Sequence, residues 1–443
     1  MKTIDRTKIK MLVHREESRY VEERPKSQAL FERAKASLLN GVPMSWMHRW
    51  AGPFPIFVKE ANGARLTDVD GHRYLDLCLG DSGAMFGHSP AATVNAIMDR
   101  AGKGMTSMLP TEDCVWVGEN LARRFGLPYW QIYMTATNAN RFAIRVARQT
   151  TQRNLILVFD GCYHGSLDET LVNYRRERIM GKPPALALTT RVVQFNDIDA
   201  VQAALSPRDI ACVICEPAMT DVGIIYPTPG YHAALREMTQ HFGTLLIIDE
   251  THTICAGPEG LTGAWNLQPD IFTLGKAVAG GFPAAVMGLS RELSERFLGG
   301  LTSREWDMGL GGTLSSNALA VAALRATLEH VMTDSAYDHM IQLAEQLEDG
   351  VDRTIKTASL PWHVIRLGCR VEYRFCPTSP QNGAEAINAY DLELDELAHL
   401  FFVNRGILLT PFHDMMLVCP ETTTEDVDLH NKVFSEFVDE LNR

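Results

Sequence analysis

The chain has 443 residues, of which 46% are hydrophobic and 22% are charged, and its formal net charge at pH 7 is −12. A chain of this length exceeds what one hydrophobic core normally serves, so we expect two domains. The acidic balance argues against nucleic acid or an anionic membrane surface as a partner, because both would require clustered Lys and Arg. No apolar stretch is long enough to span a bilayer.

The first 74 residues predict an N-terminal arm and part of a small domain. Residues 1–25 are charged and form a helical or loosely ordered arm, and residues 27–36 have apolar residues at helical spacing. Residues 55–68 predict a hairpin that turns at Asn62-Gly63.

From about Leu75 the pattern alternates between apolar strands and amphipathic helices, which is typical of a βα sheet. We predict strands at 131–135, 154–160, 210–216, 244–249, 271–275 and 284–288, and helices at 138–148 and 316–332. Residues 75–332 therefore predict a large α/β domain, and residues 333–443 predict a smaller α+β domain of long helices and short strands.

The nine cysteines give little sign of a metal or disulfide framework. Only Cys212 and Cys215 have CxxC spacing, and both fall inside an apolar run that predicts a buried strand. We interpret them as core thiols and expect no metal site. Reduced thiols, and the lack of a secretory segment at residues 1–6, predict a cytoplasmic protein.

Two predicted strands end in residues that carry chemistry. The unbroken apolar run at 244–249 ends in Asp249, and the run at 271–275 delivers Lys276 into a stretch of small residues. Carboxyl ends of strands are where open α/β sheets bind ligands, so we expect Asp249 and Lys276 to face one crevice. An aldehyde cofactor with a basic ring nitrogen would use both, and pyridoxal 5'-phosphate is such a cofactor.

A phosphate site is predicted where a strand meets a helix. Thr135, Ala136 and Thr137 lie at that point. Free N–H groups and the dipole at a helix start attract phosphate, and the threonine hydroxyls add donors.

These residues belong to a longer series of short motifs. In chain order they are Thr67-Asp68-Val69-Asp70-Gly71, Gly87-His88, Thr135-Ala136-Thr137-Asn138-Ala139-Asn140, Tyr163-His164-Gly165, Glu216-Pro217, Asp249-Glu250, Leu274-Gly275-Lys276 and Gly312-Thr313. From about Gly41 to the C-terminus the chain resembles the class III (ω-type) aminotransferases of PLP fold type I, near the branch of glutamate-1-semialdehyde aminomutase and β-amino-acid transaminase. The resemblance implies an aspartate aminotransferase-like fold, with a mostly parallel seven-stranded sheet in the large domain.

The resemblance also implies roles for individual residues. Tyr163 would stack on the cofactor ring, and Thr313 would reach the phosphate of a neighbouring subunit, which predicts a homodimer with shared sites. The cofactor-binding set would be Thr135, Ala136, Thr137, Tyr163, His164, Glu216, Asp221, Asp249, His252, Lys276 and Thr313. The chain departs from the family pattern at Ala136, Asn138 and Asp221, where relatives commonly carry Gly, Glu and Asn.

The implied mechanism makes Lys276, Asp249 and Tyr163 the catalytic residues. Lys276 would form the Schiff base and then shuttle a proton, while Asp249 would keep the ring nitrogen positive. We expect a ping-pong transaminase that moves an amino group between an amine or amino acid and an oxo acid, aldehyde or ketone. A 2,1-aminomutase or a racemase would use the same residues, and a catalytically silent PLP-fold binding subunit is the alternative from another class.

Substrate specificity depends on residues outside the cofactor set. We predict Trp46, Arg49 and Phe86 as substrate-binding residues. If Trp46 faces the pocket, it favours an amine or a bulky hydrophobic amino compound. If Arg49 turns inward instead, it offers a bidentate partner for a substrate carboxylate.

Overall fold

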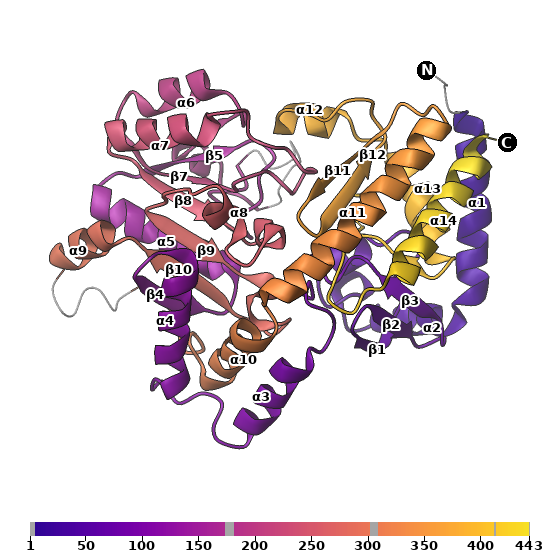
Figure 1. The fold of residues 1–443 in the computed structure, drawn as a ribbon, viewed down its shortest axis with the longest axis horizontal. Helices are drawn as coiled ribbons and strands as arrows, with labels where there is room; N and C mark the ends of the chain where they lie inside the picture. The colour runs from indigo at the N-terminus through magenta and orange to yellow at the C-terminus, as the bar shows by residue number, and fades with distance from the viewer. Residues whose placement is uncertain (1–4, 173–180, 302–308, 412, 443) are drawn as a thin grey trace. The chain divides into compact units, whose positions relative to one another are not determined.

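The computed structural model describes residues 5–172, 181–301, 309–411 and 413–442 (Figure 1). They form two compact units. The first contains the described parts of Met1–Pro90, Ser335–Ser379 and Ala389–Arg443, and the second contains those of Ala91–Asp334 and Pro380–Asn388. Among the described residues, we find no helix with the length and apolar character needed to cross a membrane.

The second unit is built on one seven-stranded sheet. Its strands are β4 (Tyr129–Tyr133), β5 (Leu155–Phe159), β6 (Thr190–Val193), β7 (Ile210–Cys215), β8 (Leu245–Asp249), β9 (Ile271–Leu274) and β10 (Ala285–Leu289). They lie in the order β4-β10-β9-β8-β7-β5-β6, and only β10 runs against its neighbours. The expected mostly parallel seven-stranded sheet is therefore confirmed.

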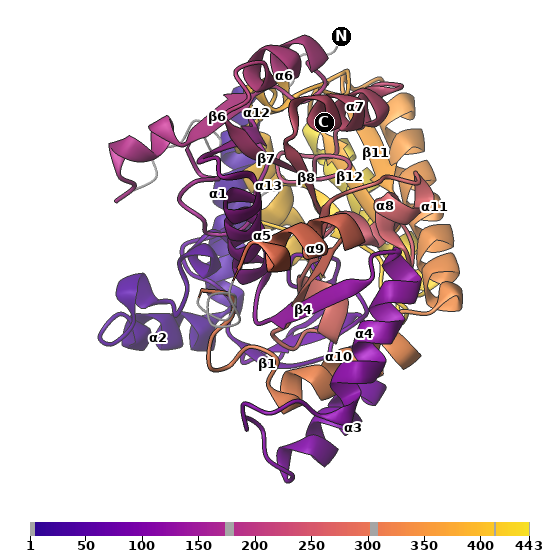
Figure 2. The same ribbon diagram turned by 90° about the vertical axis from the view of Figure 1, so that its left-hand side faces the viewer.

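Helices and short 3-10 turns connect these strands. They are α3 (Ala91–Ala101), α4 (Glu112–Phe125), α5 (Ala136–Thr151), η4 (Pro184–Leu188), α6 (Ile198–Leu205), α7 (Tyr231–Phe242), η5 (Thr253–Ala256), α8 (Gly260–Ala264), η6 (Lys276–Ala279), α9 (Arg291–Gly299), α10 (Ala318–His330) and α12 (Gly383–Asn388). Within this unit α10 packs along α3 and α4, as Figures 1 and 2 both show.

Alternate side chains of the apolar strands pack into two separate hydrophobic cores, one on each face of the sheet. Ile156, Cys212 and Ile247 pack with residues of α5 and α9, whereas Leu157 and Val213 pack with residues of α6 and α7. Successive side chains of a strand point to opposite faces, so a sheet covered by helices on both faces requires strands that are apolar throughout. This explains why these strands show no alternation in sequence.

At most strands the predicted ends agree with the structure to within one residue, and larger differences occur at two places. β4 begins two residues earlier than predicted and ends at Tyr133, because Thr135 caps α5. β6 was not predicted. It is a four-residue strand at the edge of the sheet and contains Thr190 and Arg191, so it lacks the apolar run that marks the central strands.

The first unit combines helices with two small sheets. Its elements are α1 (Arg6–Glu23), α2 (Pro25–Ala34), η1 (Leu39–Gly41), η2 (Ser45–His48), β1 (Val58–Asn62), β2 (Arg65–Asp68), β3 (Arg73–Asp76), α11 (Asp334–Thr357), β11 (His363–Leu367), β12 (Arg370–Arg374), α13 (Leu392–Val403), β13 (Ile407–Leu408), β14 (Met415–Leu417) and α14 (Thr424–Asn442). The sheets have the orders β1-β2-β3-β13 and β11-β12-β14. The hairpin is present, with its turn one residue later than predicted, since Asn62 pairs with Arg65.

The first unit extends to Pro90, beyond the boundary predicted at residue 74. β3 pairs in parallel with β13, which comes from far along the chain. Beyond β3, the N–H of Leu77 donates to the Leu408 carbonyl at 3.0 Å, and Gly63 and His88 exchange two backbone hydrogen bonds at 2.9 Å. These long-range hydrogen bonds hold residues 77–88 in the first unit. No local sequence pattern predicts such bonds.

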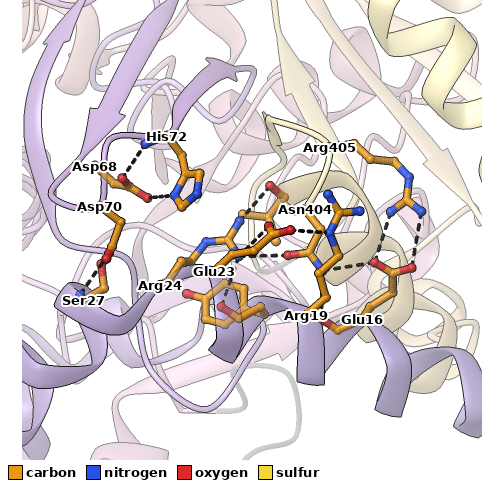
Figure 3. Close-up of polar contacts among 12 residues, drawn as sticks. Glu16, Arg19, Glu23, Arg24, Ser27, Asp68, Asp70, His72, Asn404 and Arg405 are labelled. Atoms are coloured by element: carbon orange, nitrogen blue, oxygen red, sulfur yellow. Dashed lines mark hydrogen bonds and ion pairs between the residues drawn. The ribbon is translucent and has the colours of Figure 1, made fainter.

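A buried arginine anchors the N-terminal helices to this unit (Figure 3). Arg24 lies between α1 and α2 and is only 1% exposed. Its guanidinium donates to the Tyr74 hydroxyl at 3.1 Å, to Asn404 Oδ1 at 3.0 Å and to the Val403 carbonyl at 3.1 Å. The ring of Tyr20 lies 4.3 Å from the guanidinium carbon. The predicted arm is therefore an ordered helix pair fixed to the end of α13.

Replacing Arg24 by Met should lower the free energy of unfolding by roughly 3 kcal/mol, because Asn404 Oδ1 and the Val403 carbonyl would be buried without this donor. Arg19→Met is the matched control. Arg19 is exposed and pairs with Glu23 four residues on, so its loss should cost less than about 1 kcal/mol. Urea unfolding followed by tryptophan fluorescence checks both variants, and equal midpoints would contradict the anchoring role of Arg24.

Candidate active site

Five of the residues predicted to bind the cofactor lie at one edge of the seven-stranded sheet. β4, β5, β7, β8 and β9 share one direction, since β10 runs against both β4 and β9. Their carboxyl ends lead, in chain order, to Thr135, Tyr163, Glu216, Asp249 and Lys276. The structure thus brings these five predicted residues to one edge of the sheet in the second unit, where open α/β sheets bind ligands.

Asp249 is the last residue of β8 and is 2% exposed. His164 Nδ1 donates to Asp249 Oδ2 at 3.0 Å, and the Thr251 N–H donates to Oδ1 at 3.0 Å. Burial alone would raise the pKa of Asp249, but the hydrogen bonds from His164, Thr251 and Asn140 hold that pKa below its ordinary value. The carboxylate is therefore ionised at neutral pH and suited to hold a protonated ring nitrogen.

Asn140 supports this carboxylate and had no predicted role. Its amide donates to Asp249 Oδ2 at 2.7 Å and to the His164 carbonyl at 3.0 Å, and its oxygen accepts from the Thr273 hydroxyl at 2.6 Å. A signal was present in the sequence, because Asn140 is a polar residue on the otherwise apolar buried face of α5. What the sequence could not show is that α5, β8 and β9 meet at this side chain.

Lys276 begins η6 immediately after β9 and Gly275. It is half-buried, and its φ of 49° lies in the left-handed region that residues other than glycine rarely adopt. Its Nζ lies 2.8 Å from Nε2 of His252. A Cβ on Gly275 would come within 2.8 Å of the Ala136 Cβ, so glycine is needed where β9 ends against the start of α5.

The start of α5 is shaped as an anion site. Thr135 caps the helix, since its hydroxyl accepts from the Asn138 N–H at 3.2 Å and donates to Asn138 Oδ1 at 2.9 Å. The N–H groups of Ala136 and Thr137 belong to the first turn and have no acceptor within the helix. Because the Thr135 hydroxyl is engaged with Asn138, the backbone of Ala136 and Thr137 provides the donors suited to phosphate.

The loop after β5 packs directly on this helix start. The Ser166 N–H donates to the Thr137 hydroxyl at 3.2 Å, and Gly165 has a φ of 92° with no room for a Cβ beside Thr137. Tyr163 is half-buried, and its hydroxyl lies 3.3 Å from Ser166 Oγ. Tyr163 therefore stands beside the anion site, where an aromatic ring can lie against a flat cofactor.

Glu216 shapes the loop that follows β7. It is 2% exposed and accepts hydrogen bonds from both the backbone N–H and the hydroxyl of Thr220. The loop presents Asp221 half-buried at the next position. Contact of Glu216 or Asp221 with the cofactor stays a prediction.

The remaining predicted residues have other surroundings. Thr313 is exposed in the turn before α10. Trp46 is half-buried in η2 and Arg49 is exposed just after it, both in the first unit. The Phe86 ring is 1% exposed and packs edge-on against Tyr337 at 5.6 Å, so Phe86 contributes to the core of the first unit. This packing argues against the predicted substrate contact of Phe86.

The two cysteines with CxxC spacing are core residues. Cys212 and Cys215 lie in β7 with no exposed surface, and burial raises the pKa of the Cys212 thiol to about 12. All nine cysteines lie in the described part of the chain, and none of them forms a disulfide there.

Together these residues fit pyridoxal phosphate. Lys276 offers an amine for the aldehyde, Asp249 an ionised carboxylate for the ring nitrogen, and the first turn of α5 backbone donors for the phosphate. Each group lies at the end of a different strand or the start of the following helix, and all of them lie in the same unit.

Comparison with known proteins agrees with this chemistry. The sequence model described as Aminotransferase class-III matches residues 46–439. The glutamate-1-semialdehyde 2,1-aminomutase of Chloroflexus aggregans is 32% identical over 91% of this chain and 95% of its own length, and that of Sorangium cellulosum is 34% identical over 87% and 90%.

Solved structures show the same relationship. A glutamate-1-semialdehyde-aminomutase from Pseudomonas aeruginosa PAO1 in complex with PMP is 47% identical, covers 99% of both chains and has a TM-score of 0.95. An omega-transaminase from Sphaerobacter thermophilus is 25% identical, covers 94% of this chain and 98% of its own, and has a TM-score of 0.85.

Asn140→Leu should move the acid limb of the pH–rate profile to higher pH. A lowered pKa keeps Asp249 ionised down to acidic pH, and removal of the Asn140 donor raises that pKa, so the ionised form is lost earlier as the pH falls. Thr273→Val removes only the hydroxyl that orients Asn140 and should give a smaller shift in the same direction. Rates of amino transfer measured from about pH 3 to 9 check both, and superimposable acid limbs would contradict the role of Asn140.

Proposed function

Because the chain belongs to the class III aminotransferases and is a pyridoxal phosphate enzyme, we propose that it acts as a 2,1-aminomutase on an amino aldehyde. The observation that carries this proposal is full-length similarity to aminomutases, at 47% identity over 99% of both chains for the Pseudomonas aeruginosa protein. The sequence analysis placed an intermolecular transaminase first. The relatives favour the aminomutase alternative instead.

The site residues supply what such a reaction requires. Bound pyridoxal phosphate provides an electron-poor ring that draws electrons from the substrate carbon next to nitrogen. Asp249 holds the proton on the ring nitrogen, and the first turn of α5 holds the phosphate. Lys276 Nζ removes a proton from one carbon and returns it at another. Both half-reactions use the same side chains, so one site can take the amino group from a molecule and return it to that molecule.

A substrate carboxylate would need a cation. We propose Arg49 for this role, since an aminomutase of the glutamate-1-semialdehyde type acts on a carboxylate, and guanidinium groups bind carboxylates in a bidentate manner. Arg49 follows directly on η2 and is exposed in the first unit.

Transamination of a hydrophobic amine is the second candidate. It is favoured by Trp46, which offers apolar surface within the same short segment, and by the likeness to the omega-transaminase. The two candidates differ in whether the amino group leaves with a second molecule, which a kinetic experiment can separate.

Holoenzyme treated with an amino donor and then freed of it should convert glutamate 1-semialdehyde for many turnovers without any added oxo acid. The product is the isomer with the amino group on C1 and the oxo group on C2, which ¹³C NMR of C1 distinguishes. Lys276→Ala should abolish turnover, because it removes the amine that forms the Schiff base and moves the proton. Consumption of the aldehyde that stops at about one equivalent per site until the amino donor is supplied again would establish the transaminase instead.

We also propose a homodimer in which Thr313 completes the phosphate site of the partner subunit. Thr313 is exposed within its own chain, as a residue that serves a neighbour would be. We further propose a cytoplasmic location, which is supported by nine cysteines that form no disulfide with one another in the described residues.

Mixed dimers test this sharing. Thr313→Asp should inactivate the enzyme by repelling the phosphate, and Lys276→Ala is inactive for its own reason. In a mixture of the two variants, each mixed dimer carries one site with an intact Lys276 and an intact partner threonine. Activity should recover to about a quarter of the wild-type value, since half of the dimers are mixed and each has one such site. No recovery in dimers shown by mass to be mixed would contradict sharing.

A further inference from the structure

The amine of Lys276 meets a histidine at hydrogen-bond distance. Lys276 Nζ lies 2.8 Å from His252 Nε2, and His252 is 8% exposed. The two residues come from different strands, since His252 follows β8 and Lys276 follows β9. The contact is therefore produced by the pairing of those strands and is absent from any local sequence pattern.

Hydrogen-bond chemistry limits what this pair can be. A lysine ammonium has only donors, so the contact requires His252 Nε2 to accept, with the ring proton on Nδ1. An ordinary lysine amine is cationic at neutral pH, yet only the neutral amine can attack a carbon or take a proton. The neutral imidazole of His252, 2.8 Å from the amine, is a base that can accept the proton of the lysine ammonium.

The backbone on the histidine side is fixed by neighbouring residues. Asp249 Oδ1 accepts from the Thr251 N–H, which closes the turn after β8. Glu250 is fully buried and accepts hydrogen bonds from Thr253 and Thr262, so this part of the segment is anchored on both sides of His252. His252 is thereby held between two anchored residues and directed to the lysine.

The lysine side is fixed as well. Lys276 has a left-handed φ of 49°, and such backbone strain persists only where surrounding packing enforces it. Here Gly275 lies against Ala136, and Ala277 and Val278 are fully buried directly after the lysine. Lys276 and His252 are therefore both held in place by the residues around them, so proton transfer between them requires no loop rearrangement.

We propose that His252 is a further catalytic residue, which exchanges a proton with the amine of Lys276. In the step, one N–H bond of the ammonium breaks and an N–H bond forms on Nε2, which leaves a neutral amine and an imidazolium. The reverse transfer restores the starting state, so no other reactant is needed. This assignment rests on the proposed function only for Lys276 as the reacting amine, and it holds for an aminomutase and a transaminase alike. The family resemblance assigned His252 to the cofactor, whereas this geometry assigns it to the lysine.

Chemical labelling of Lys276 tests the proposal independently of turnover. Holoenzyme is treated with an amino donor, which frees Lys276 from the cofactor, and is then exposed to limiting cyanate at pH 7. Carbamylation of Lys276, relative to the exposed Lys356, is measured by mass spectrometry. Because cyanate reacts with the neutral amine, His252→Leu should lower this ratio at least about 10-fold.

Two further variants separate proton exchange from packing. His252→Gln can still accept a hydrogen bond but cannot take the proton, so it should lower both labelling and the rate of the first half-reaction, the rate by about 100-fold. It should also remove one limb of the pH–rate profile. His241→Gln, on the exposed last turn of α7, is the control and should change neither.

Labelling separates the outcomes. Equal labelling of Lys276 in the wild type, His252→Leu and His252→Gln overturns the proposal, whatever happens to the rate. Labelling that falls in both variants supports it, even if glutamate 1-semialdehyde is not the substrate. If Lys276→Ala stays active, the proposed function fails, and that result does not depend on His252.

Discussion

A carboxylate buried at the end of β8 must stay ionised, and much of the second unit serves that requirement. Asp249 lies inside the protein, where burial favours the neutral acid. Hydrogen bonds from His164, Thr251 and Asn140, together with the charge attraction of His164, stabilise the ionised carboxylate. These donors come from α5, from the loop after β5 and from the turn after β8, so the charge depends on the correct assembly of several elements.

The hydrogen-bond network that keeps Asp249 ionised also helps to position Lys276. Asn140 joins Asp249 to Thr273 of β9, and β9 leads directly to Lys276. The side chain that stabilises the carboxylate therefore also fixes the strand that delivers the amine. On the other side of the site, Gly275 permits β9 to end against the start of α5, where phosphate donors are exposed. Amine, carboxylate and anion site are positioned by one set of contacts.

The first unit contains a buried positive charge that is also stabilised by hydrogen bonds. The guanidinium of Arg24 is buried and is satisfied by carbonyl, amide and hydroxyl oxygens, together with the face of Tyr20. Nearby Glu16 is buried as well, and although burial favours its neutral form, hydrogen bonds from Arg405, Asn404 and Arg15 keep its pKa below the ordinary value. Such groups are costly unless fully paired, so they specify how the N-terminal helices attach.

The sequence by itself determined the central strands of the large unit and the residues at their ends. Unbroken apolar runs mark buried parallel strands, and the chemistry of Lys276 and Asp249 is visible because each residue directly follows or ends such a run. Only tertiary structure decided the contacts of Asn140 and His252, the edge strand β6 and the extension of the first unit to Pro90. The reason is physical, because local periodicity encodes which face of an element is buried, whereas these features depend on side chains and strands that meet from distant parts of the chain.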